Sequence, residues 1–278
     1  MPPGFRLALA VAFYFALGTA AHADLPLTIE DVIAKEHELT IELGFDYGNL
    51  YTSDFVEKRN QDLLSTTLGI RYGLTPRTEI YGGIRGNANQ TRVSTGRVRS
   101  HASNGLQWRS LTIGLNHRFS PDNDTPALLG YLQSEVIENA TFTNQPHAVY
   151  GKTWEAGVTT YRRVDPVVFS LSAGFRYSRS RDMNGVIGTI TPGNTVRLSA
   201  KMNLALNAEA SMFWGTRWSY QSGMQMGGHP IEINATQTSL LLGGAYAVSP
   251  RTTLHFDLSA DISGRGGGNL GTLFRHTF

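Results

Sequence analysis

From residue 38 to the end of the chain, hydrophobic and polar residues alternate in short segments. In the segment 38–47, Leu39, Ile41 and Leu43 lie between polar residues and glycines. In 253–262, every second residue from Leu254 to Ile262 is hydrophobic, and the residues between them are polar. A period of two places successive side chains on opposite faces of a β-strand. The pattern therefore predicts strands with one apolar and one polar face.

The alternation predicts an all-β fold of about twelve strands, each about ten residues long, which is the length that crosses a membrane as part of a barrel. The predicted strands are 38–47, 66–73, 78–87, 111–119, 127–138, 154–160, 167–177, 196–204, 210–218, 238–246, 253–262 and 270–278.

The predicted connections alternate in length. Short turns are expected at 74–77, 120–126, 164–166, 207–208 and 249–251. Longer loops rich in Gly, Asn and Ser are expected near 52–62, 88–104, 139–151, 179–194 and 219–235. Short turns at one end and long loops at the other are typical of an antiparallel up-and-down barrel in the outer membrane, with both termini on the periplasmic side.

A soluble β-sandwich would also show alternation. Aromatic residues, however, gather near both ends of the predicted strands, as expected at the two interfaces of a lipid bilayer. They are Tyr72, Phe119, Tyr246 and Phe278 at one end, and Tyr47, Tyr177 and Trp218 at the other. This distribution favours the transmembrane barrel.

The N-terminal 23 residues have the pattern of a signal peptide. Arg6 precedes an apolar run from Leu7 to Leu17, and Ala21-His22-Ala23 gives a small-x-small cleavage site. The apolar run is too short to span a membrane, and no later segment reaches the length of a membrane helix. We therefore expect residues 1–23 to be removed, residues 24–35 to form a periplasmic lead-in, and residues 36–278 to form the barrel.

Residues 27–35 are predicted to form a short helix in this lead-in. Thr28 is a plausible N-cap, and Glu30 and Asp31 fall in the first turn, where the helix dipole favours acids. The segment, which ends at Lys35, either tucks under the barrel or acts as a plug or gate.

Composition agrees with a barrel and excludes several classes of function. Charged residues make up 17% of the chain, below the usual 25% or so of soluble proteins, and the mean hydropathy is −0.20. The net charge of +2 is too small to indicate nucleic acid as a partner. Cysteine is absent, which excludes disulfides, a thiol nucleophile and zinc–cysteine sites. No cofactor and no metal site are expected.

The alternation also identifies candidates for the lumen. Closure of a barrel would bring the last strand beside the first, so the acids of the first and eleventh strands would share one wall. The cations of the seventh to ninth strands would lie roughly across from them, giving a transverse field that orients polar solutes. Alternatively, these charges pair with neighbours. The candidates are Glu38, Glu42, Asp46, Arg71, Arg176, Arg197, Lys201, Arg217, His255, Asp257, Asp261 and Arg275.

Several segments resemble outer-membrane transporters of the MetA-pathway of phenol degradation family, and channels of functional-amyloid secretion. They are LTIEDVIAKEHELTIELGFDYGN, TLGIRYGLTPRTEIYG, NHRFSPDNDTPALLGY, TTYRRVDPVVFSLSAGFRY and TLFRHTF. The resemblance implies an outer-membrane transporter. Phe274 and the terminal Phe278 resemble the signal read by the barrel-assembly machinery. The amyloid-secretion channels are similar to trimers with a long coiled coil, and no heptad region follows Asp24.

These observations lead to three hypotheses of function. The first is a channel for a small solute, hydrophobic or aromatic as the resemblance implies, and the second is an export channel for an amyloid-like or small secreted protein. The third is a structural or adhesive barrel. An enzyme is not expected, because His255 and Asp257 share a face without a partnered serine. Expected partners are outer-membrane lipid, lipopolysaccharide and the assembly machinery; a homo-oligomer is left open.

Overall fold

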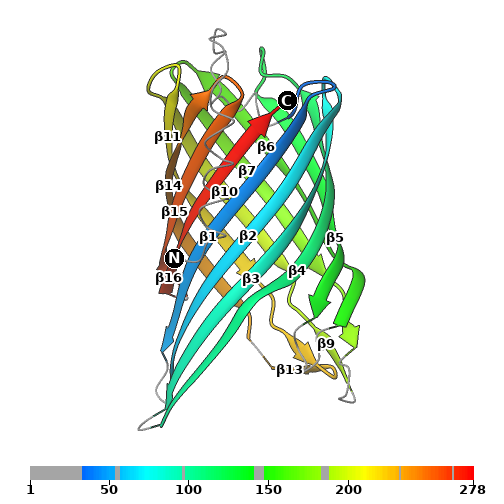
Figure 1. Cartoon of the computed structure of the whole chain (residues 1–278), viewed down its shortest axis with the longest axis vertical. Coiled ribbons are helices and arrows are strands. Elements are labelled where there is room, and N and C mark those ends of the chain that lie inside the picture. Colours follow the sequence, from blue (N-terminus) through cyan, green and yellow to red (C-terminus); the bar gives the residue numbers. More distant parts are fainter. Residues whose placement is uncertain are drawn as a thin grey trace, which may run out of the picture.

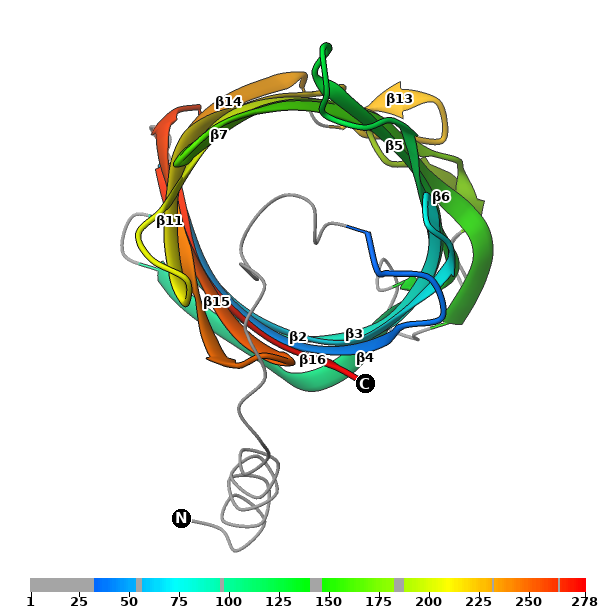
Figure 2. The same cartoon turned by 90° about the horizontal axis from the view of Figure 1, so that it is seen from above.

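The chain forms a closed antiparallel β-barrel of twelve strands (Figures 1 and 2). The computed structural model describes residues 33–53, 57–95, 98–140, 147–182, 188–231, 233–264 and 266–278. The barrel strands are β1 (Leu39–Ser53), β2 (Glu57–Thr75), β3 (Thr78–Thr95), β4 (Val98–Ser120), β5 (Ala127–Ala140), β6 (His147–Val164), β7 (Val167–Ser178), β10 (Thr195–Ala205), β11 (Ala210–Gln221), β14 (Ala235–Ser249), β15 (Thr252–Ser263) and β16 (Gly266–Thr277). The predicted all-β class and the closed antiparallel barrel of twelve strands are confirmed.

Each barrel strand pairs with its neighbours in the chain, and β16 pairs with β1 to close the sheet. At the closure Thr40 lies opposite Thr277, and the amide of Phe278 donates to the carbonyl of Leu39 at 2.9 Å. The five short turns lie where the sequence predicts them. We call this end of the barrel, which also holds the C-terminus, the turn end, and the opposite end the loop end.

Two of the predicted long loops are wrong. Residues 57–62 and 88–95 continue β2 and β3, and residues 98–104 begin β4. Figure 1 shows these strands extending beyond the other strands at the loop end. The extension has polar residues on both faces, for example Asn60 paired with Arg92, so alternation could not reveal it.

Two of the other long connections, 179–194 and 219–235, contain a small separate sheet. It is formed by β8 (Arg181–Asp182), β9 (Thr189–Thr191), β12 (Gln225–Met226) and β13 (His229–Pro230). Arg181 ties it to the barrel wall, because its guanidinium donates to Glu138 at 2.6 Å and to Thr153 at 2.7 Å. All three side chains are buried. This ion pair fixes one of the long connections against β5 and β6.

The outer face of the barrel is apolar. The side chains of Leu68, Leu171 and Leu258 are exposed by 54%, 58% and 48%, and the hydrophobic members of the other strands are similar. A continuous apolar face of this kind is unfavourable in water and is typical of barrels in lipid. No helix in the described residues is long and apolar enough to span a membrane.

On the inner face, tyrosines lie flat against glycines of the neighbouring strands. A Cβ built on Gly114 of β4 would lie 2.2 Å from the ring of Tyr81 on β3. Tyr131 of β5 covers Gly157 of β6 and Gly174 of β7 in the same way. Because glycine has no side chain, each ring lies along the wall instead of projecting into the lumen.

This arrangement predicts that Gly114→Ala destabilises the barrel by about 1–3 kcal/mol, because the added methyl group displaces Tyr81. Urea unfolding of the protein in lipid vesicles, followed by tryptophan fluorescence, would measure the change. Gly82→Ala is the matched control, since its Cβ would meet nothing nearer than a carbonyl at 3.5 Å. Equal stabilities of the two variants would contradict this account of the inner wall.

Candidate functional site

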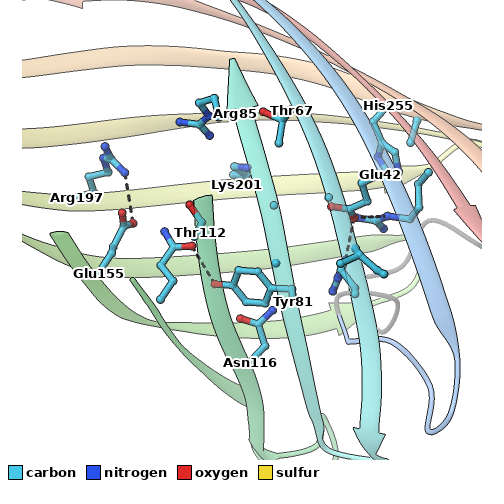
Figure 3. Close-up of a pocket in the computed structure, with 18 of the residues that line it drawn as sticks. Glu42, Thr67, Tyr81, Arg85, Thr112, Asn116, Glu155, Arg197, Lys201 and His255 are labelled. Carbon is cyan, nitrogen blue, oxygen red and sulfur yellow. Dashed lines mark hydrogen bonds and ion pairs between the residues drawn. The ribbon is translucent and has the colours of Figure 1, made fainter. Parts of the chain in front are cut away.

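The lumen contains a cavity of about 690 Å³ lined by residues of all twelve barrel strands (Figure 3). Asp46, Asp257 and Asp261 are not among the lining residues. The lining of the cavity is strongly charged. The cations are Arg71, Arg85, Arg176, Arg197, Lys201 and Arg275; the acids are Glu42, Glu135 and Glu155; and His255 also faces it. A charged, water-accessible interior is usual for barrels that admit polar solutes.

Glu42 forms the first charged cluster, at the seam where the barrel closes. Its carboxylate accepts from Arg275 of β16 at 2.8 Å and from Arg71 of β2 at 3.3 Å. The two cations therefore neutralise Glu42 from both neighbouring strands. This cluster has the arrangement of the alternative expectation, in which lumen acids pair with cations on neighbouring strands such as Arg71 and Arg275.

Glu79 of β3 extends the cluster toward the turn end, and its side chain is fully buried. It forms an ion pair with Arg71 and accepts from the Asn116 amide at 2.6 Å. Its second oxygen accepts from the backbone N–H of Ala34 at 2.5 Å. One carboxylate thus joins three barrel strands to the segment that precedes the barrel.

That segment, residues 33–38, is hereafter the N-terminal strap, and it lies inside the turn end of the barrel (Figure 2). Ile33 is buried against the inner wall of β5, β6 and β7, where it contacts a cluster formed by Ala127, Leu129, Tyr161 and Val168. On the other side, the His37 amide donates to the carbonyl of Gly73 at 2.9 Å. The strap therefore reaches from the wall of β2 and β3 to the wall of β5–β7.

Gly73 makes this close approach possible, because a Cβ on it would lie 1.9 Å from the carbonyl oxygen of Lys35. Residues 33–35 are not helical, so this part of the predicted helix is wrong. The contacts with Gly73 and Glu79 hold the backbone extended instead. Thr28, Glu30 and Asp31 lie outside the described residues. Lys35 and Glu38 are joined within the strap, where the Lys35 amide donates to the Glu38 carboxylate at 3.0 Å.

On the opposite wall, two cations have acid partners two strands away in the barrel. Arg176 of β7 pairs with Glu135 at 2.5 Å, and Arg197 of β10 lies 3.4 Å from Glu155. Glu155 also accepts from the hydroxyl of Tyr131 at 3.0 Å. These acids neutralise much of the positive wall that the sequence predicts.

The predicted acidic wall is assembled across β16. Asp46 of β1 and Asp257 of β15 both lie opposite Gly271, and their carboxylates approach each other over this glycine. Asp261 accepts from the Ser239 hydroxyl at 2.7 Å. Arg176 lies on the far side of the barrel from β1, as expected, but Arg217 on β11 is separated from β15 by β14 alone. The expected distance between Arg217 and the acids is therefore wrong.

Sequence reasoning missed Glu79, Arg85, Tyr131, Glu135 and Glu155. Their alternation was a usable signal, because Glu79 and Arg85 share one parity of β3, and Tyr131 and Glu135 share one parity of β5. Because Tyr81 and Tyr131 point inward, the sequence pattern shows hydrophobic residues on both faces of β3 and β5.

Phe274 and Phe278 lie on the outer face of the closing strand, and Phe278 is 55% exposed. Among the described residues, no group of His, Asp and Glu could hold a metal ion.

No known protein family and no curated protein matches the sequence. The structure, however, is similar to an outer-membrane channel from Pseudomonas putida F1, with a TM-score of 0.63 and 11% identity over 94% of this chain and all of that one. It is also similar to the transport unit of the autotransporter AIDA-I from Escherichia coli, with a TM-score of 0.56 and 11% identity over 99% of this chain and 97% of that one.

The translocator domain of the autotransporter NalP from Neisseria meningitidis gives a TM-score of 0.50 and 12% identity, over 99% of this chain and 95% of that one. The fold is that of an outer-membrane barrel. At these identities the similarity concerns the fold, so the function has to be argued from the lumen of this chain.

The Glu79 cluster predicts a large difference between two acid-to-alanine variants. Glu79→Ala should lower the free energy of unfolding by about 3 kcal/mol, because it removes the buried acceptor that Arg71, Asn116 and the Ala34 amide share. Glu135→Ala removes a partner of the more exposed Arg176 and should cost about 1 kcal/mol. Urea unfolding in lipid vesicles would measure both, and equal losses would contradict the anchoring role of Glu79.

Proposed function

We propose that the protein is an outer-membrane channel through which a small solute crosses the polar lumen. The observation that carries this proposal is a charged cavity inside a closed barrel with an apolar outer face. Such a barrel places a water-filled path across the membrane, and the charges along the path select solutes. Residues 1–23 would act as the signal peptide, and the terminal Phe278 would guide assembly in the outer membrane.

The lining supports a small solute that has both a polar group and an apolar or aromatic part. Ion-paired side chains on both walls project into the cavity, which argues against large cargo. Between the charges, the rings of Tyr81, Tyr131 and Phe213 offer apolar contact surface. This mixture accommodates the aromatic compound that the sequence resemblance implies, if that compound also carries a polar group.

The N-terminal strap is proposed to be a gate at the periplasmic end. It lies across the turn end, where it is held by Glu79 and Gly73 on one wall and by the Ile33 contacts on the other. A solute that enters the periplasm through the turn end would have to pass this strap. Its displacement should therefore widen the path.

A second candidate is an export channel for a polypeptide. The similarity to two autotransporter transport domains favours it. The charged clusters around Glu42 and Glu155 line the path that a polypeptide would take, so they would have to move aside. We therefore rank solute transport first.

The gate is tested by single-channel conductance in planar bilayers, with and without residues 24–35. We expect steady conductance from the intact protein and about a twofold or greater increase after deletion, because the deletion removes Ile33 and Ala34 from the mouth of the barrel. No conductance from either form, with a normal shift of the folded barrel on a gel, would contradict the channel and favour a structural or adhesive barrel.

A point variant tests the same gate without shortening the chain. In Gly73→Ala the new methyl group occupies the place of the Lys35 carbonyl, so the strap cannot close against β2. Its conductance should approach that of the deletion. Gly83→Ala is the matched control, because it faces the lumen nearby and its Cβ would meet no atom closer than 3.4 Å. Unchanged conductance in Gly73→Ala would contradict the gate.

A further inference from the structure

Arg217 on β11 occupies an unusual position in the lumen, because neither of its paired residues on the neighbouring strands is an acid. Its partners on the neighbouring strands are Ser199 of β10 and Ser239 of β14. Two residues away on β10, on either side of Ser199, are Arg197 and Lys201, which face the same lumen. Like charges on adjacent positions of a sheet repel one another. The sequence therefore places three cations around Ser199, with no acid at a paired position of Arg217.

The other lumen arginines show that this is not a general feature of the wall. Arg71 and Arg275 share Glu42, and Arg176 pairs with Glu135. Of the three cations around Ser199, Arg197 has an acid partner in Glu155. Arg217 and Lys201 form no ion pair with any described residue; the ammonium of Lys201 lies 5.1 Å from the ring centre of Phe213. Asp257 and Asp261 lie beyond β14.

A separate hollow in the wall lies directly beside these cations. Its volume is about 230 Å³, and it is lined by Tyr131, Ser172, Gly174, Arg197, Ser199 and Arg217, together with Glu155 and Ala173. The ring of Tyr131 forms its apolar side, because this ring lies flat over Gly157 and Gly174 with its other face toward the lumen. The guanidinium of Arg217 and the hydroxyls of Ser172 and Ser199 form its polar side.

We propose that this hollow is a binding site for a small aromatic carboxylate. The proposal rests on the proposed channel function and names its class of solute. A planar guanidinium can hold a carboxylate through two parallel hydrogen bonds, and a ring stacked on Tyr131 adds apolar contact. Lys201 adds attraction from the neighbouring position. The volume suits a molecule with one ring and is smaller than the pockets that hold drug-sized ligands.

The carboxylates in the lumen also set the orientation of such a solute. Glu155 in the hollow is already engaged by Arg197 and Tyr131, so it leaves Arg217 available. Asp257 and Asp261 on β15 repel an anion from the side beyond β14. The carboxylate of the solute therefore turns toward β10 and β11, and the ring turns toward β5–β7.

The test is isothermal titration of the full protein, purified in detergent micelles, with sodium benzoate as the probe. We expect saturable binding that Arg217→Gln weakens by about tenfold or more, because a charge-assisted hydrogen-bonded pair is lost. Arg85→Gln is the matched control. It removes a lumen cation that forms no ion pair with any described residue. Arg85 lies on β3, across the barrel from β11, so its loss should change the affinity less than about twofold.

A second variant keeps the binding site testable if Arg217→Gln fails to fold. Ser199→Asp keeps Arg217 and supplies an acid at its partner position, so it should abolish benzoate binding while the barrel still folds. Cyclohexane carboxylate and phosphate separate the contributions of ring stacking and charge, and both are expected to bind more weakly than benzoate. Equal effects of Arg217→Gln and Arg85→Gln, undiminished binding in Ser199→Asp, or no saturable binding would each overturn the site.

The titration does not depend on conductance. Benzoate binding by a protein that gives no current would uphold the site and reject the channel. Current through a protein that does not bind benzoate would reject the site and leave the channel standing.

Discussion

The structure depends on one constraint, which is that backbone N–H and C=O groups cannot be left unpaired in lipid. A sheet meets this constraint by closing on itself, so that β16 pairs with β1 and no strand edge remains. Closure then divides the side chains of every strand into a lipid-facing and a lumen-facing set. The charged residues that line the cavity belong to the second set, and the chemistry that we propose is concentrated there.

Within the lumen, the same constraint determines which charges interact. Strand register decides which side chains are neighbours, and it places Glu42 between Arg71 and Arg275 but places Arg217 between two serines. The paired charges connect strands of the wall. In the binding site that we propose, the cations without acid partners would attract the solute. Glycines opposite Tyr81 and Tyr131 keep the rings against the wall, so that space remains between the charged clusters.

Alternation predicted the barrel, the strand number and the short turns because each membrane-crossing strand has one apolar face. It failed for residues 57–62 and 88–95, where strands continue beyond the apolar zone with two polar faces. It could not assign ion pairs, because a one-residue shift of register changes every neighbour. It also misread residues 33–35 as helical, since the contacts with Gly73 and Glu79 come from residues about 40 positions away.

The central claim is that solute and ions pass through the lumen beside the basic wall. Because the chain has no cysteine, Lys201→Cys provides a single thiol in the cavity for a water-soluble methanethiosulfonate reagent. The account predicts stepwise changes in single-channel current as the reagent attaches a charged group, with no change for the unmodified wild type. Complete labelling by mass spectrometry without any change in current would contradict it.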